Sequence, residues 1–406
     1  MRNLQKTFAH SKCRSFSRQF NGLLILIAMV ILNSCISRVP ERISLLPVTF
    51  PAIPPASGDS VQPGLAGPVC GAHANFVLVA GGANFENGLP WRGGKKVYHD
   101  EIYLMEKTTS GEFVWKQSTE KLPFPMAYLA CISTPEGVLS IGGEDRNGPV
   151  NHVFLFAFQN GSIQIETLPE LPQSISSAGA ALIGSSVFVA GGLTSQGATT
   201  AFYTINLQNK TNGWRVLPEL PLALSHAVLV RQSDGEEDCI YVFGGRNRTG
   251  EVTTFYSAVW KFKPSVQKWI QEGDILFEGK KLGLSAGTGI AAGSKHILLF
   301  GGDPGIYFNR TERLNNDLEK ASGEEEKQRL WKEKDVMLSN HPGFSKDILS
   351  FNTSSKKWEK IGNLTGESPA TTTAFIWNGM VVIPSGEVRP GVRTPNVIGL
   401  EIGVNK

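Results

Sequence analysis

Short apolar runs recur along the chain, and each one ends in a pair of small residues. Five of the runs end in a Gly-Gly doublet, and a sixth ends in Ser385-Gly386, where serine replaces the first glycine. The five doublets are Gly81-Gly82, Gly142-Gly143, Gly191-Gly192, Gly244-Gly245 and Gly301-Gly302. Short apolar runs bounded by turn residues are typical of buried β-strands. The pattern therefore predicts six equivalent strands.

A second, alternating segment follows each doublet, and a tryptophan follows four of these segments. The tryptophans are Trp115, Trp214, Trp269 and Trp358. An apolar strand, a glycine doublet, an aromatic strand and a tryptophan at a period near 50 residues resemble the kelch repeat. Each kelch repeat forms one four-stranded blade of a β-propeller. The resemblance implies an all-β fold, a six-bladed kelch-type β-propeller over residues 42–403.

The sixth repeat lacks its outermost strand, because only six residues follow Leu400. Residues 43–47, Ile-Ser-Leu-Leu-Pro, have the Leu-Pro ending that closes other repeats. A propeller whose first and last blades are not joined would expose strand edges that can pair with other chains. We therefore expect the N-terminal strand to complete the last blade.

The interval before the sixth repeat contains an insertion at residues 303–344. Its middle, from Glu312 to Met337, is rich in Glu, Lys and Leu, and Leu314 and Leu318 have helical spacing. This pattern predicts one or two helices in the fifth blade. Long insertions in compact folds are usually functional or disordered, and the helical pattern with Trp331 favours a lid over a pocket mouth.

Composition agrees with many short strands joined by tight turns, because the chain has 44 glycines and 23 prolines in 406 residues. The length suffices for one large domain or two ordinary ones. The formal net charge is only +3 and no basic face is concentrated, so the composition argues against nucleic-acid binding.

The N-terminal residues 1–34 resemble an export signal of the lipoprotein type. Basic residues precede an apolar run, Leu23 to Leu32, that is too short to span a bilayer. Leu32-Asn33-Ser34-Cys35 resembles a bacterial lipobox, which implies lipidation at Cys35, a tether at residues 35–41 and a membrane-anchored protein in the periplasm or cell envelope. An ordinary cleaved signal is the alternative.

Cys70 and Cys131 occupy equivalent places, each 11 residues before its doublet. A disulfide between them is possible in an oxidising compartment, but two buried thiols are favoured.

The segments that follow the doublets are the candidates for chemistry, because a propeller gathers one set of loops around its central axis. They are rich in Arg and Lys with few carboxylates, which suits an anionic small ligand. They contain Asn84, Trp91, Arg92, Lys95, Lys96, Glu144, Asp145, Arg146, Arg246, Arg248, Asp303, Phe308, Asn309, Arg310, Glu387, Arg389 and Arg393.

One of these segments resembles a known family. Residues 385–394, Ser-Gly-Glu-Val-Arg-Pro-Gly-Val-Arg-Thr, resemble the Gly-Glu-x-(Lys/Arg)-Pro-Gly-x-Arg-Thr segment of bacterial N-acetylneuraminate epimerases, the sialic acid mutarotases. Phe308-Asn309 after its doublet and Ile141-Gly-Gly-Glu144 resemble other blades of that family. The Gly-Glu blade comes last here, as in the group called cyclically permuted mutarotases, and permuting a closed ring keeps spatial neighbours together.

By this resemblance Glu387 is the catalytic proton acceptor and Arg393 holds the substrate carboxylate, while Glu144 and Asn309 are further candidate substrate-binding residues. The implied reaction inverts the anomeric centre of a 2-keto sugar acid by opening and closing its ring, which a positioned base can assist. It requires no cofactor and no metal. Its partner is a small sugar acid, with no nucleic acid or obligate protein partner. The acid that assists Glu387 is open, with Glu144 or water as candidates.

Three alternatives remain at this stage. A sialidase would carry Asp-box turns, and the nearest segment, Thr109 to Trp115, lacks the aspartate. A non-catalytic kelch propeller would bind a glycan or a protein, because fold alone does not give function. In that case Glu387 would only stabilise its turn by pairing with Arg389 or Arg393. Copper chemistry like that of galactose oxidase is weakest, because its Cys, Tyr and His ligand set is not apparent.

Overall fold

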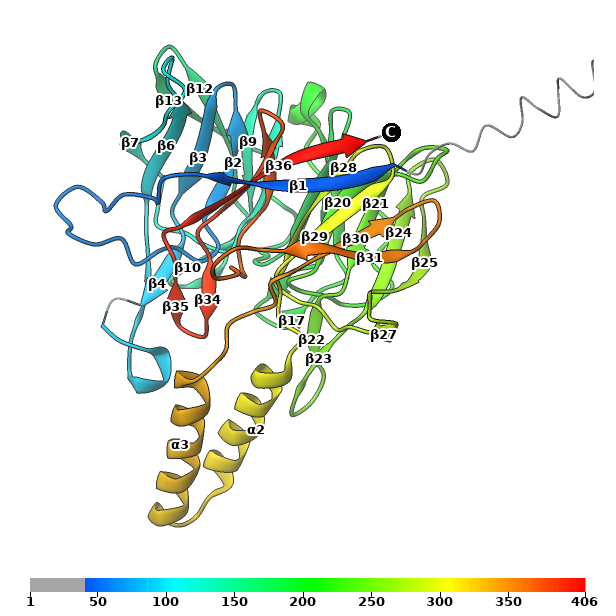
Figure 1. The fold of residues 1–406 in the computed structure, drawn as a ribbon. Helices are drawn as coiled ribbons and strands as arrows, with labels where there is room; N and C mark the ends of the chain where they lie inside the picture. Colours follow the sequence, from blue (N-terminus) through cyan, green and yellow to red (C-terminus); the bar gives the residue numbers. More distant parts are fainter. Residues whose placement is uncertain (1–40, 86, 406) are drawn as a thin grey trace, which may run out of the picture. The chain divides into compact units, whose positions relative to one another are not determined.

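The computed structural model describes residues 41–85 and 87–405, and residues 43–403 form one compact unit. The described residues form six four-stranded sheets, which are the blades of a β-propeller (Figure 1). The six-bladed propeller expected from the doublets is confirmed. The export signal predicted for residues 1–34, and all of the predicted tether but its last residue, lie outside the described part.

In each of the first five blades the innermost strand comes first in the sequence and the outermost comes last. Blade one contains β2 (Val69–His73), β3 (Phe76–Ala80), β6 (Glu101–Lys107) and β7 (Phe113–Lys121). Blade two contains β8 (Ala130–Thr134), β9 (Gly137–Ile141), β12 (Val153–Gln159) and β13 (Ser162–Leu168). Blade three contains β14 (Gly179–Ile183), β15 (Ser186–Ala190), β18 (Phe202–Asn206) and β19 (Arg215–Val216). Blade four contains β20 (Val228–Ser233), β21 (Asp238–Phe243), β24 (Ala258–Lys263) and β25 (Lys268–Asp274). Blade five contains β28 (Thr288–Ala292), β29 (His296–Phe300), β30 (Asp347–Asn352) and β31 (Trp358–Asn363).

Blade six joins the two ends of the propeller chain. It contains β32 (Phe375–Trp377), β33 (Met380–Pro384), β36 (Val397–Asn405) and, outermost, β1 (Arg42–Thr49). β1 lies beside β36 in Figure 1, and its Ile43 and Leu45 pack against the core of this blade. The expected completion of the last blade by the N-terminal strand is confirmed.

The polypeptide after each doublet folds on one side of the propeller. In five blades it forms a two-stranded ribbon. The ribbons are β4 (Ala83–Phe85) with β5 (Lys96–Tyr98), β10 (Glu144–Asp145) with β11 (Gly148–Pro149), β16 (Leu193–Thr194) with β17 (Gly197–Ala198), β22 (Arg246–Arg248) with β23 (Thr253–Phe255), and β34 (Glu387–Arg389) with β35 (Val392–Arg393). In blade five the helices α2 (Ile306–Lys320) and α3 (Glu324–Ser339) take this place and extend from the same side (Figure 1). The expected helical insertion is confirmed.

Smaller elements complete the described chain. They are the ribbon of β26 (Leu276–Phe277) with β27 (Lys280–Lys281) and the 3-10 helices η1 (Pro90–Arg92) and η2 (Leu207–Asn212).

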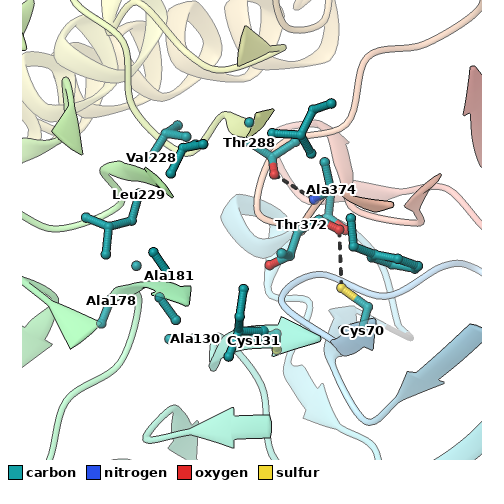
Figure 2. A pocket seen from close by; sticks show the side chains of 18 of the residues that line it. Cys70, Ala130, Cys131, Ala178, Ala181, Val228, Leu229, Thr288, Thr372 and Ala374 are labelled. Atoms are coloured by element: carbon teal, nitrogen blue, oxygen red, sulfur yellow. Dashed lines mark hydrogen bonds between the residues drawn. The ribbon is translucent and has the colours of Figure 1, made fainter. Parts of the chain in front are cut away.

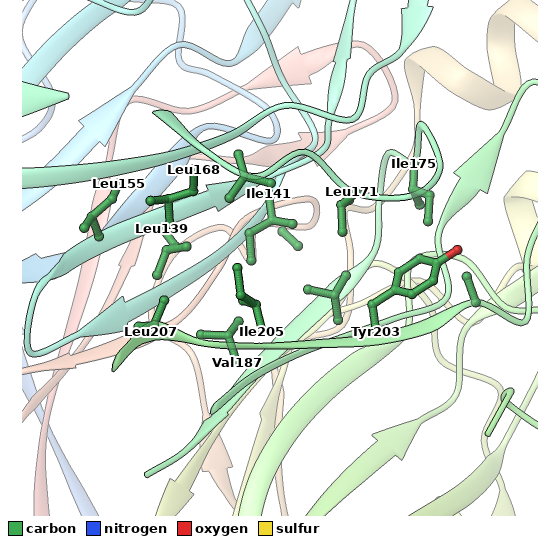
Figure 3. Packing of buried hydrophobic residues seen from close by; sticks show 14 residues of the cluster. Leu139, Ile141, Leu155, Leu168, Leu171, Ile175, Val187, Tyr203, Ile205 and Leu207 are labelled. Atoms are coloured by element: carbon green, nitrogen blue, oxygen red, sulfur yellow. The ribbon is translucent and has the colours of Figure 1, made fainter. Parts of the chain in front are cut away.

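The core lies between neighbouring blades, because each sheet buries the alternating side chains of both faces. Figure 3 shows the layer between blades two and three, where Leu139 and Leu155 face Val187 and Ile205. All four side chains are almost fully buried. Burying an aliphatic side chain of this size stabilises the fold by about 1.5–3 kcal/mol, so each blade depends on its neighbours.

Ser385 takes the backbone conformation of the glycine that it replaces. Its φ is 54°, and the first glycines of the other doublets have φ between 61° and 66°. L-residues rarely adopt this left-handed conformation. The buried Ser385 hydroxyl accepts a hydrogen bond from the Leu65 N–H and donates one to the Thr394 carbonyl, both at 2.7 Å. The serine therefore joins the entry of blade one to the ribbon of blade six.

A closed ring of backbone hydrogen bonds surrounds the propeller axis. One residue from each blade, just before its innermost strand, donates its N–H to the carbonyl of the equivalent residue in the neighbouring blade at 2.6–3.0 Å. All six have left-handed φ of 53–60°. We call them the ring residues, and they are Gly67, Tyr128, Ser177, His226, Ala286 and Thr371. Five are not glycine, and each costs on the order of 1 kcal/mol of backbone strain, which the hydrogen bonds offset.

The innermost strands enclose an axial channel of about 430 Å³. Its wall is mostly apolar, with Ala130, Ala181, Val228 and Leu229 among the side chains in Figure 2. The ring residues line one end of this channel.

Cys70 and Cys131 also line the channel and are buried free thiols, as expected. The Cys70 Sγ lies 3.4 Å from the Thr373 carbonyl oxygen, while the Cys131 Sγ lies 3.7 Å from the Pro68 oxygen.

Candidate functional site

Glu387 and Arg393 face each other across the ribbon of blade six. They are register partners on β34 and β35, and Arg393 Nη1 donates to Glu387 Oε1 at 3.1 Å. The Gly391 N–H donates to the same oxygen at 2.9 Å. The Arg393 side chain is only 3% exposed and its guanidinium lies 4.8 Å from the centre of the Phe85 ring. Two donors therefore hold the carboxylate in place.

Glu387 belongs to a set of six equivalent positions. In every blade the residue directly after the doublet pairs with the residue just before a ring residue. We call these positions the mouth positions, and they hold Ala83, Glu144, Leu193, Arg246, Asp303 and Glu387. Because they pair outside the ring of hydrogen bonds, three carboxylates and one arginine are brought to the same end of the axis.

Lys96 and Tyr128 connect Glu144 to Arg393. Glu144 Oε1 accepts from the Tyr98 hydroxyl at 2.7 Å and from Lys96 Nζ at 3.1 Å. The Lys96 ammonium lies 5.0 Å from the centre of the Tyr128 ring. Burial lowers the pKa of Lys96, but Tyr128 and Glu144 raise it to about 12. Burial also raises the pKa of Tyr128, which Lys96 and Arg393 oppose, so Tyr128 stays a neutral phenol between two cations.

Arg246 occupies the mouth position of blade four and lies among aromatic rings. Its guanidinium is 4.6 Å from the centre of the Phe308 ring, and Nη2 donates to His226 Nε2 at 3.2 Å. Burial, followed by the charge of Arg246, lowers the pKa of His226 well below 6.5. The imidazole is therefore neutral and accepts the arginine hydrogen bond. Burial also lowers the pKa of Arg246, while Asp303 and Glu387 raise it.

Asp303 occupies the mouth position between Arg246 and Glu387. Its Oδ1 accepts from the Gly305 N–H at 2.8 Å, and among the described residues Oδ2 has no hydrogen-bond partner. Burial raises the pKa of Asp303, the Gly305 N–H and Arg246 lower it, and Glu387 raises it. The net shift is upward, so this carboxyl holds a proton more readily than an ordinary aspartate.

Several polar atoms around the mouth are buried without a partner in the part of the chain that the structure describes. They are Arg389 Nε, Arg393 Nε, Asn309 Oδ1 and Asn84 Oδ1. A buried polar atom without a hydrogen bond costs about 1–3 kcal/mol. Clustered orphan donors and acceptors are what a polar ligand would satisfy.

The helical pair is fastened to the ribbons around the mouth. Arg92 donates to both oxygens of Asp335 on α3, at 2.6 and 2.9 Å, and the Trp91 indole donates to Asp335 at 2.8 Å. Glu312 on α2 accepts from the Thr253 N–H at 2.7 Å. Blades one and four thus hold the helices from two sides.

The structure brings together some of the residues chosen from sequence. Glu387 and Arg393 are in contact, and Glu144 is linked to them through Lys96 and Tyr128. Asn309 follows Phe308 on α2 and makes no hydrogen bond to Glu387 or Arg393 among the described residues. None of the four lines the axial channel, because the ring residues lie between that channel and the mouth positions.

Tyr128 and His226 are site residues that the glycine doublets did not reveal. Both are ring residues that contact an arginine of the mouth. Alanine or serine precedes every ring residue, and it lies 15 residues before the doublet in four blades, that of Tyr128 among them. Ser225 lies 19 residues before Gly244, so a search at the common spacing would have found Tyr128 but not His226.

Within residues 41–85 and 87–405, no group of three or more His, Cys, Asp and Glu side chains is arranged to hold a metal ion.

Comparison with known proteins identifies the family. Residues 168–406, more than half of the chain, match the family model described as N-acetylneuraminate epimerase. The chain belongs to the N-acetylneuraminate epimerase family. The matched part contains Arg246, Asp303, Glu387 and Arg393, whereas Glu144 and the residues around Lys96 precede it.

Curated epimerases of this family resemble the chain over part of their length. The N-acetylneuraminate epimerase of Haemophilus influenzae (strain PittEE) is 29% identical over 249 residues, which are 59% of this chain and 60% of that protein. The N-acetylneuraminate epimerase of Pasteurella multocida (strain Pm70) is 26% identical over 229 residues, 56% of this chain and 57% of that protein. The chain thus spans about three fifths of the relatives that it matches.

A solved structure described as that of YjhT shares the fold. It aligns with a TM-score of 0.58 and 13% identity, over 88% of this chain and 99% of that one. In the described part of this epimerase-family chain, no helix is long and apolar enough to cross a membrane.

Proposed function

We propose that this chain is a sialic acid mutarotase, an isomerase that interconverts the α and β anomers of N-acetylneuraminate. The observation that carries the proposal is the Glu387 carboxylate, which is held by a backbone N–H and a buried arginine at the mouth of a propeller of the epimerase family. The relatives that match this chain over about three fifths of their length are named N-acetylneuraminate epimerases.

The reaction needs a base at the anomeric hydroxyl. The sugar acid is a cyclic hemiketal, so a base removes the hydroxyl proton, the bond from the anomeric carbon to the ring oxygen breaks, and the ring oxygen takes up a proton. The open ketone then closes on its other face. Glu387 Oε1 is occupied by its two donors, and among the described residues Oε2 has no hydrogen bond. Oε2 is therefore the oxygen that would accept the proton.

The cations of the mouth would hold the substrate carboxylate. Arg393 keeps Nε without a partner in the described chain and lies beside the base. Arg246 and Lys96 add positive charge on either side of it. An arginine fork binds a carboxylate in a fixed orientation, which would keep the anomeric carbon beside Glu387 while its configuration inverts.

The proposal is tested by following fresh α-N-acetylneuraminate by proton NMR with and without the protein. We expect the protein to accelerate conversion to the β anomer in proportion to its concentration. Glucose, which mutarotates but lacks a carboxylate, is the matched control and should be unaffected. Equal rates with and without protein, across several 2-keto sugar acids, would reject the activity. Binding of the sugar acid without acceleration would instead favour a non-catalytic glycan-binding propeller.

We also propose that the chain is exported and anchored to a bacterial membrane through a lipid on Cys35, within the cell envelope. The apolar run and the lipobox-like Leu32 to Cys35 support this. Mass analysis of the mature protein should give an N-terminal acylated Cys35. A mature chain that starts at another residue would reject the anchor.

A further inference from the structure

The three carboxylates at mouth positions have different hydrogen-bond partners, and this difference indicates that they have different roles. Glu144 is bonded to the Lys96 ammonium and the Tyr98 hydroxyl. Glu387 is bonded to the Arg393 guanidinium and the Gly391 N–H. Asp303 receives one backbone N–H and no hydrogen bond from a cation among the described residues. Asp303 is thus the one of the three carboxyls that has no hydrogen-bonded cation among the described residues.

Asp303 and Glu387 lie in neighbouring blades at equivalent heights above the ring. The Asp303 N–H and carbonyl both pair with Ser285, the residue before Ala286, at 2.8 and 3.0 Å. The Glu387 N–H and carbonyl both pair with Ala370, the residue before Thr371, at 2.9 and 2.7 Å. Because Ala286 and Thr371 are themselves hydrogen-bonded at 3.0 Å, the backbones of Asp303 and Glu387 occupy equivalent places in adjacent blades, and the charge of Glu387 acts on the Asp303 carboxyl.

We infer that Asp303 is the acid that works with Glu387, giving a proton to the ring oxygen of a 2-keto sugar acid as the ring opens. The inference rests on the proposed mutarotase function and names the proton donor that the reaction requires. Neither Glu144, which is tied to Lys96, nor bulk water is needed for this step.

The proton balance closes over one turnover. During opening, Glu387 takes the proton of the anomeric hydroxyl, the bond from the anomeric carbon to the ring oxygen breaks, and the Asp303 proton passes to that oxygen. During closure, the same oxygen attacks the other face of the ketone and returns its proton to Asp303, while Glu387 protonates the former ketone oxygen. Paired carboxyls whose environments separate their proton affinities commonly divide acid and base roles in this way.

The test compares Asp303→Asn with wild type, because asparagine retains an acceptor for the Gly305 N–H. The mutarotation rate of α-N-acetylneuraminate at saturation is measured by NMR. Binding is measured by calorimetry with the 2-O-methyl glycoside, which cannot open its ring. We expect the rate to fall by about 10²–10⁴-fold, with binding of the glycoside changed less than about threefold. Asp274→Asn, on the outermost strand of blade four and paired with Lys281, is the matched control and should keep the wild-type rate.

A pH profile adds a readout that a purely structural role would not alter. The charged groups that face Asp303 are Arg246 on β22 and Glu387 on β34. The wild-type rate should decline as rising pH removes the Asp303 proton, and Asp303→Asn should lack that decline. Asp303→Glu serves if the asparagine variant does not fold, and it should retain both the decline and part of the rate.

The other outcomes overturn the inference. An Asp303→Asn rate within about twofold of wild type would remove Asp303 from the chemistry. Lost glycoside binding with an unchanged saturated rate would make it a binding residue. A wild-type protein without any acceleration would reject the mutarotase function itself, and with it this role, and that result is visible in the wild-type measurement alone.

Discussion

At the scale of single residues, several residues around the mouth have an unusual backbone conformation. Ser385 and the ring residues Tyr128, His226 and Thr371 have left-handed φ, which is costly for residues other than glycine. Such strain persists where the surrounding structure fixes it, and here hydrogen bonds to neighbouring blades do so. The same residues border the mouth, so substitutions at these positions are expected to affect both the stability of the fold and the proposed site.

Replacing Ser385 with alanine should destabilise the protein. The substitution keeps the backbone strain but leaves the buried Leu65 N–H without its acceptor. We expect a loss of about 1–3 kcal/mol in the free energy of unfolding, measured by urea denaturation. Ser355→Ala in an exposed turn is the control and should be neutral. Equal midpoints for the two variants would show that the Ser385 hydroxyl is dispensable.

His226 should make stability depend on pH. Its folded pKa lies well below the ordinary 6.5, so the unfolded state binds a proton that the folded state excludes. Its contribution to stability is complete above pH 6.5 and is lost as the pH falls through the window between 6.5 and the folded pKa. The loss should reach about 1.4 kcal/mol per pH unit within that window.

The measurement is urea denaturation at pH 7.5 and 5.5 for wild type and His226→Gln. Glutamine retains an acceptor for Arg246 but does not titrate, so its stability should fall less on acidification. An identical fall in both proteins would contradict a buried neutral His226.

At the scale of elements, the role of the helical pair, α2 and α3, depends on the contacts that hold it to the propeller. Trp91 joins the apolar cluster of Leu314, Leu330 and Met337 and also bonds Asp335. Outside this cluster, the Phe308 ring of α2 packs against Phe255 of β23, so few apolar contacts hold the pair to the blades. The pair is therefore expected to open more readily than the blades.

Trp91→Ala should loosen the lid without unfolding the propeller. We expect faster amide hydrogen exchange in α3 and a raised KM for the sugar acid, with little change in Tm. Trp331→Ala is the control, because it removes a tryptophan of α3 that is 44% exposed. Unchanged exchange in α3 for Trp91→Ala would show that the helices are held by other contacts.

The sequence was most informative where a local rule fixes the structure. Glycine doublets after apolar runs located the second strand of each blade in order from the axis, because the left-handed backbone at the end of this strand favours small residues. Glu387 and Arg393 were found through a contiguous motif. Tyr128 and His226 were missed because they lie outside the segments that follow the doublets and approach the mouth only when the ring closes. The groups that surround Glu144 and Asp303 also come from the ribbons of other blades, so their proximity could not be predicted from sequence.

At the scale of the whole molecule, closure of the propeller is the feature that holds the site together. Mouth positions come from all blades, and the ring hydrogen bonds run from blade to blade without interruption. β1 seals the outer edge of blade six, which carries Glu387 and Arg393. The opening of the ring at this blade places the ribbon of Glu387 and Arg393 between the last two blade strands of the chain, β33 and β36.

Removal of residues 1–49 should therefore destabilise the whole propeller. It leaves β36 as an open strand edge and uncovers the side chains packed beneath β1. We expect a lower urea midpoint and aggregation at concentrations where the longer chain stays monomeric. Removal of residues 1–40 is the control and should preserve the wild-type midpoint. Equal midpoints for both truncations would show that β1 is not needed for closure.

The most direct test of the central claim is the rate at which Glu387→Gln interconverts the anomers of N-acetylneuraminate, measured by NMR beside wild type and the exposed control Glu359→Gln. Glutamine keeps an acceptor for the Gly391 N–H and for Arg393 but cannot take up the hydroxyl proton. We predict a loss of about 10²–10⁴-fold in rate for Glu387→Gln and no loss for the control. A folded Glu387→Gln protein that interconverts the anomers as fast as wild type would contradict the account.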